Sequence, residues 1–249
     1  MPFAPCHPSS FHPDRSALKA SNATFTPMLC LANSYKHHAR CVAGLDWQGN
    51  AAGGWIRPVS GAGEDSSIPQ PRYGDGLPVL PGHVVGVPLL NEFPWQHQCE
   101  NRLVRPTLPW RKLGRLAWKD LADLADDADL PLWASGGSVH NDRVLPGAVS
   151  SAEGSLRFIR VDRAYLFATR QPGGHDKVKV KIEFGFAGNW YRLSVTDPIV
   201  LGAFGRGGLV RADVGETLIC ASLTLPFGDY CYKLAASVMV RPKGSLSPS

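Results

Sequence analysis

Polar and apolar residues alternate along several short segments of this chain. In residues 156–161 (LRFIRV) and 177–186 (KVKVKIEFGF) the period is two, which is typical of a strand with one buried face. Further strands are expected from short apolar runs at 28–32, 41–45, 54–57, 83–90, 190–196, 217–225 and 231–240. A turn rich in Gly and Asn separates 41–45 from 54–57, and this arrangement predicts a hairpin.

One segment has helical spacing instead. Between residues 110 and 130 the apolar positions Leu113, Leu116, Leu121 and Leu124 recur at intervals of three to five residues. This spacing predicts one helix over 110–130, although Gly114 weakens its first half.

Many short strands with a single intervening helix favour a mainly β fold, namely two small β-barrels of the OB type or a related type. The 26 glycines and 21 prolines agree with numerous turns. No alternation of strand and helix is present, and neither G-x-G-x-x-G nor G-x-x-x-x-G-K-[ST] occurs. Rossmann and P-loop nucleotide-binding folds are therefore poor explanations.

Composition changes along the chain predict its organisation. Residues 1–27 are rich in Pro, His, Ser and Ala without periodicity, so we expect a flexible extension ahead of a functional start near Met28. A Gly-, Ser- and Pro-rich stretch suggests a linker between two halves. The expected divisions are 28–134 (first half and helix), 135–154 (linker), 155–243 (second half) and 244–249 (tail).

The overall composition excludes several classes of protein. A hydrophobic content of 44% argues against disorder, and no apolar run approaches the roughly 18 residues of a membrane span. No secretory leader is recognisable, and the six cysteines include no C-x-x-C pair. We therefore expect a cytoplasmic protein with reduced thiols, no bound metal and no cofactor. The formal charge of +5 is compatible with phosphate binding without demanding it.

Two segments of the first half carry candidate ligand-binding residues. Lys36 and Arg40 lie in a basic stretch (SYKHHARC) after the first strand, where they would hold a phosphate or simply face solvent. Trp55 and Arg57 lie on one side of an extended segment, as a stacking platform beside a cation or as part of the core.

A polar cluster follows in WQHQCENRLV. His97, Glu100 and Asn101 could read a base edge, and His97 with Glu100 could act as general acid and base. The spacing of His97 and Cys99 fits no zinc-ligand rule. In the second half, Asp197 precedes Pro198 as a turn former would, and Tyr232 and Lys233 lie on opposite faces of a strand.

Six segments in order resemble the bacterial dual OB-containing domain family: CLANSYKHHARCVAG, GWIRPVS, HQCEN, NDRV, LSVTDP and CYKLAA. The likeness runs from about Met28 to Val240. It implies two OB-like barrels, a nucleic acid or nucleotide partner, and a setting in bacterial defence or conflict. The positions that it carries over are Ser34, Lys36, Arg40, Trp55, Arg57, Ser60, His97, Glu100, Asn101, Asp142, Arg143, Asp197, Tyr232 and Lys233.

Three functions follow as hypotheses. The first is a module that binds nucleic acid, above all single strands, or a nucleotide. The second is an enzyme acting on such a ligand through His97 and Glu100. The third is an interaction scaffold in which the polar residues hold the two halves together.

Overall fold

The computed structural model describes residues 24–36, 39–49, 51–61, 66–105, 108–126, 129–133, 141–150, 153–170, 178–204 and 211–242. The chain divides into two compact units. The first takes the residues up to Arg115 together with Val149–Leu156, and the second takes Leu116–Ala148 and the residues from Arg157 onward.

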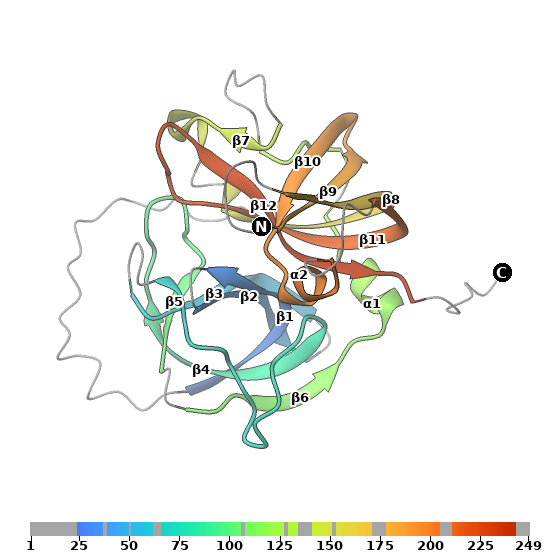
Figure 1. The fold of residues 1–249 in the computed structure, drawn as a ribbon. Coiled ribbons are helices and arrows are strands. Elements are labelled where there is room, and N and C mark those ends of the chain that lie inside the picture. Colours follow the sequence, from blue (N-terminus) through green and yellow to red (C-terminus); the bar gives the residue numbers. More distant parts are fainter. Residues whose placement is uncertain are drawn as a thin grey trace. The chain divides into compact units, whose positions relative to one another are not determined.

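The first unit is a closed β-barrel. Its strands are β1 (Thr24–Lys36), β2 (Ala39–Gln48), β3 (Ala51–Val59), β4 (His83–Glu92), β5 (Asn101–Val104) and β6 (Arg111–Arg115). They follow the order β1-β2-β3-β5-β4-β6, and an additional β1–β4 pairing closes five of them into a barrel (Figure 1). The predicted hairpin is confirmed as the antiparallel pair of β2 and β3.

The second unit repeats this arrangement. Its strands are β7 (Arg143–Val144), β8 (Leu156–Arg170), β9 (Val178–Phe186), β10 (Asn189–Val195), β11 (Arg211–Leu223) and β12 (Cys231–Val240). The order is β10-β9-β8-β11-β12-β7, and β10 also pairs with β12. In both barrels the third strand runs parallel to the fifth, as β3–β5 and β10–β12. The expectation of a mainly β fold with two OB-like barrels is confirmed.

Alternating side chains fill each barrel. In the first unit Met28, Cys30 and Val42 belong to one buried apolar cluster with residues of β3, β4 and β5. In the second, Phe184 and Tyr191 are buried and stack with ring centroids 5.5 Å apart. Because successive residues of a strand face opposite sides, the neighbours of these core residues point out of each barrel.

The helix predicted over 110–130 is mostly wrong. Among the described residues of this segment, only Trp118–Ala122 forms a helix, α1, and residues Arg111–Arg115 form β6, which pairs with β4. Gly114 lies opposite Val84 in that pairing, so backbone hydrogen bonds to β4 outweigh the weak helical preference of the segment. A second helix, α2, spans Pro198–Phe204, and a 3₁₀ turn spans Pro146–Ala148.

Strand β1 begins at Thr24, ahead of Met28, and Thr24–Pro27 pair with Leu89–Gly86 of β4. The rest of the expected extension, residues 1–23, lies outside the described residues. Cys99 is disulfide-bonded, which corrects the expectation that all thiols are reduced. No helix within the described ranges is long and apolar enough to cross a membrane.

Candidate nucleic-acid interface

OB barrels commonly bind oligonucleotides on the face of their second and third strands, flanked by the loops between strands one and two and between strands four and five. In the first unit these elements are β2–β3, the β1–β2 connection and the β4–β5 connection. In the second unit they are β9–β10 and the β8–β9 and β11–β12 connections. Most residues singled out from the sequence lie in or beside these elements.

Arg57 of β3 forms the centre of the first-unit residues. Its Nη2 lies 3.0 Å from Oε1 of Glu100 and donates a 2.7 Å hydrogen bond to Oγ of Ser155. The Ser155 hydroxyl also donates to the same carboxylate. Since Arg57 is 3% exposed and Glu100 is 7% exposed, this is a buried ion pair with almost no surface open to a ligand.

The β1–β2 end of the first barrel joins this network. Arg57 Nη1 lies 4.0 Å from the Cys41 sulfur, and the carbonyl of Cys41 accepts a 3.1 Å hydrogen bond from Ser34 Oγ. Ser34 is buried, so its hydroxyl holds β1 and β2 together in their hairpin. The residues singled out from the sequence therefore do lie close together, but their polar groups contact one another and leave little surface for a ligand.

More open positions lie at the tip of the same hairpin. The Arg40 guanidinium lies 4.0 Å from the centroid of the exposed Tyr35 ring, a cation–π contact. Lys36 Nζ donates to Ser66 Oγ. Ser60 lies outside this hairpin, directly after β3, where it is exposed and donates to the carbonyl of Ser67. His37 and His38 lie outside the described residues.

The β4–β5 connection is tightly folded. Trp95 and Gln98 exchange backbone hydrogen bonds of 3.2 and 2.9 Å, and His97, Glu100 and Asn101 are buried. Asn101 Nδ2 lies 3.5 Å from Gln98 Oε1. In the hypothesis of acid–base catalysis Glu100 would have to exchange a proton while Arg57 and Ser155 hold its carboxylate. Trp55, on β3 opposite Leu45, is half-buried.

In the second unit, residues around the β11–β12 connection form an aromatic group with a cation. The Arg143 guanidinium lies 5.3 Å from the ring centroids of both Tyr230 and Tyr232, and Phe227 contacts Tyr232 with ring centroids 6.5 Å apart. Arg143 Nε donates a 2.8 Å hydrogen bond to Asp142, and this bond raises the pKa of the guanidinium. Phe227 is 77% exposed, so the group is open to a ligand. We call Arg143, Phe227, Tyr230 and Tyr232 the aromatic group.

Lys233 and Asp197, the other two residues singled out in the second half, make contacts that stabilise the fold. Lys233 is 2% exposed, its Nζ donates a 3.0 Å hydrogen bond to the carbonyl of Trp133, and burial lowers its pKa to about 8. Asp197 caps α2 by accepting from the backbone N–H of Ile199 at 2.8 Å, and its second oxygen accepts from Val238 at 2.9 Å. Like Arg57, Lys233 presents almost no surface to a ligand.

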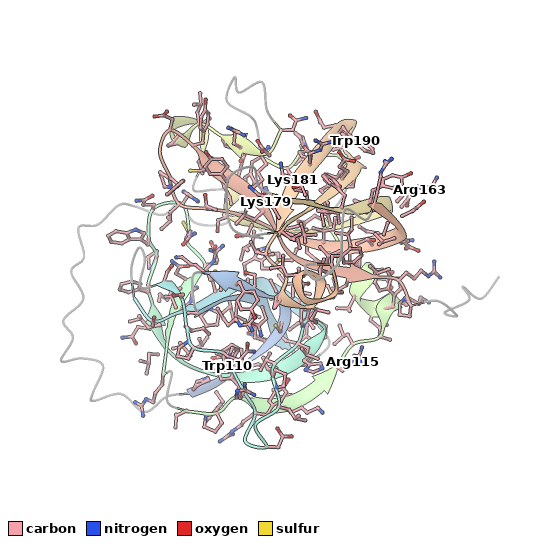
Figure 2. All side chains as sticks on the ribbon, in the orientation of Figure 1. Trp110, Arg115, Arg163, Lys179, Lys181 and Trp190 are labelled. Carbon is pink, nitrogen blue, oxygen red and sulfur yellow. The ribbon has the colours of Figure 1, made fainter. Side chains whose placement is uncertain are left out.

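The outer surface of β8, β9 and β10 was missed by the sequence analysis. The register of these strands places side chains in cross-strand rows. They are Thr169–Lys179, then Phe167–Lys181–Ser194, then Tyr165–Glu183–Arg192, and finally Gly185–Trp190. We call these rows the β8–β10 face; Lys179, Lys181 and Trp190 are labelled in Figure 2.

Cations and rings lie close together on the β8–β10 face, with the buried Glu183 among them in an ion pair with Arg192. The Arg192 guanidinium lies 5.0 Å from the Phe167 ring centroid, and Arg163 and Arg211 lie 5.5 and 4.5 Å from that of Tyr165. Within the described part of the chain, Lys179 and Lys181 form no salt bridge. Partial burial and, to a lesser extent, the neighbouring Lys179 charge lower the pKa of Lys181.

A family model for the dual OB-containing domain matches residues 26–238. The chain belongs to this family. No curated protein sequence matches it. Among solved structures it is similar to the one titled "Crystal structure of the tetrameric p202 HIN2", with a TM-score of 0.31 and 9% identity over 89% of this chain and 98% of that one. A likeness at this TM-score supports no inference about ligands.

One feature of this dual OB-containing protein could have revealed the β8–β10 face from the sequence. In KVKVKIEFGF the lysines occupy every second position, so they must share the solvent face of their strand. The aromatic residues on β8 could not be added, because their register against the lysines depends on how β8 and β9 pair. Within the described residues no cluster of three or more His, Cys, Asp or Glu could hold a metal ion.

Proposed function

We propose that this protein binds single-stranded nucleic acid on the β8–β10 face of its second barrel, with the aromatic group as a neighbouring contact. The observation that carries the proposal is that the rows of this face bring Phe167 beside Lys181, Lys179 into the adjacent row and the exposed Trp190 to the end of the face. Two of the three strands in these rows, β9 and β10, are the second and third strands that OB barrels commonly use for oligonucleotides.

Each part of the surface suits one part of a single strand. Lysine and arginine side chains attract the phosphates, and aromatic rings stack on bases at about 1–3 kcal/mol per base. Tyr165 and Phe167 are half-buried and already carry guanidinium groups over their rings. Trp190 is 54% exposed, so its ring offers a face for stacking. Because every base has such a face, stacking alone would give weak sequence preference.

The aromatic group extends the same surface. Ser194, in the row of Lys181, pairs with Leu234 of β12, two residues after Tyr232, so the group lies near the lysine row. Arg143 is already held over two tyrosine rings, a geometry in which a guanidinium keeps N–H donors for a phosphate. The proposed interface therefore includes Arg143 and Tyr232, whereas the buried Arg57 and Lys233 would support the fold around it.

Two double variants test the proposal. Lys179→Ala with Lys181→Ala should weaken binding to a labelled single-stranded oligonucleotide and reduce the salt slope by up to about 1.4, since each lost phosphate contact in a single strand contributes about 0.7. The matched control, Lys112→Ala with Lys119→Ala, removes two exposed lysines from β6 and α1. Equal affinity and slope in both double variants would exclude the β8–β10 face as the binding surface.

A further inference from the structure

A groove opens beside Trp190 in the second unit. Its volume is about 820 Å³, and three segments line it. They are the end of α1 with the residues after it up to Asp126, the stretch Arg160–Asp162 of β8, and the β9–β10 hairpin from Gly185 to Trp190. A space of this size accommodates a nucleobase with its sugar.

Trp190 connects the groove to the β8–β10 face. It pairs with Gly185 across the hairpin, and a β-carbon on Gly185 would lie 3.7 Å from the indole ring. The ring therefore lies against bare backbone on one side and is 54% exposed overall. A base bound at the Gly185–Trp190 row, the last row of the face, would contact this ring directly.

The groove differs in charge from the rows that lead to it. Arg160 is paired with Glu216 at 2.6 Å, and Asp126 accepts a 2.9 Å hydrogen bond from the backbone N–H of Phe158. Asp162 is exposed, and it makes no hydrogen bond or salt bridge to any other described residue. A carboxylate repels phosphate and accepts from N–H donors, so this wall suits a base and disfavours the backbone.

We propose that the groove holds one base of a bound strand, stacked on Trp190, with Asp162 accepting from an exocyclic amino group. This proposal rests on the proposed function. Cytosine offers an N4 amino donor at the position where uracil carries an O4 acceptor, and carboxylates pair with that donor. The groove therefore selects cytosine over uracil.

Matched oligo(dC) and oligo(dU) test this selection, because they share a sugar, a backbone and a ring size. The wild-type protein should bind oligo(dC) about tenfold more tightly, within the range of one good base contact. Asp162→Asn should bring the ratio close to one while keeping affinity for oligo(dU). Trp190→Ala should weaken the binding of both.

The control is Asp123→Asn, which removes an exposed carboxylate of the same unit outside the groove and should leave the ratio unchanged. Thermal melts establish that each variant is folded. Equal wild-type affinities, or a ratio that survives Asp162→Asn, would overturn the groove proposal while leaving the β8–β10 face in place. Absence of binding to both oligonucleotides would overturn the proposed function as well.

Discussion

The guanidinium of Arg57 and the carboxylate of Glu100 lie 3.0 Å apart, and both side chains are buried. Their shared partner, Ser155, directly precedes the first residue of β8. The pair thus fastens the segment Val149–Leu156 to the first unit, with which that segment is grouped. Because the two charges are paired within the protein, we expect the ion pair to affect the free energy of unfolding and not ligand binding.

Glu100→Ala should lower the free energy of unfolding by about 3–5 kcal/mol, since it leaves the Arg57 charge buried without its partner. Urea denaturation measures the loss. The double variant Arg57→Met with Glu100→Leu should recover most of it, because removal of both charges also removes their desolvation cost. A single variant as stable as the wild type would show that the ion pair contributes nothing.

Gly44→Ala should destabilise the first barrel by about 3 kcal/mol or more, at the upper end for overpacked sites. A β-carbon at Gly44 would lie 2.1 Å from the carbonyl oxygen of Leu29, which belongs to the backbone of β1 and cannot rotate away. Gly114→Ala is the control, because a β-carbon there would meet nothing within 4 Å. Similar chemical denaturation midpoints for the two variants would contradict the close approach of β1 and β2.

Ala187→Gly should stabilise the second barrel by about 1 kcal/mol. Ala187 and Gly188 have φ values of 48° and 69° at the β9–β10 turn, and the left-handed region costs an alanine about 1–2 kcal/mol. The same exchange at the exposed Ala52 of β3 should instead cost about 0.5–1 kcal/mol. Differential scanning calorimetry compares them, and a lower melting temperature for Ala187→Gly would show that the turn is not strained.

Lys233 should make stability depend on pH under alkaline conditions. Burial lowers its pKa from 10.5 to about 8, so between these values the unfolded chain holds a proton that the folded chain has released. The free energy of unfolding should therefore rise with pH from about 8 to 10.5 through this group, relative to the variant Lys233→Met. Urea denaturation across this pH range gives the difference in free energy of unfolding between the two proteins. A difference that stays constant with pH would contradict the burial of a charged lysine.

The sequence predicts the barrels well because their strands carry the pattern of period two themselves. The segment VKVKIEFGF forms β9, and CYKLAASVMV forms β12 with the predicted limits. The helix at 110–130 fails because β4 offers residues 111–115 hydrogen-bonding partners that no local pattern reveals. Pairing across 25 or more residues is decided by the tertiary structure.

The roles of the polar residues were harder to predict from the sequence than the strands. Arg57 and Glu100 stand out in the sequence because charged residues interrupt apolar runs, yet that feature is shared by buried ion pairs and by ligand sites. Lys181 and Arg192 look like ordinary surface charges, and only the register of β8–β10 places Phe167 and Tyr165 beside them. Which charged residues face a ligand is therefore a property of strand pairing.

The most direct test of the central claim is a fluorescence-anisotropy titration of the full chain with labelled single-stranded DNA, single-stranded RNA and duplex over a series of salt concentrations. We predict saturable binding to a single strand that is tighter than binding to duplex and weakens as salt rises, because phosphate contacts release counterions. Stacking on Trp190 and its neighbours should leave measurable affinity at high salt. Absence of binding to either single strand at low salt would contradict the account.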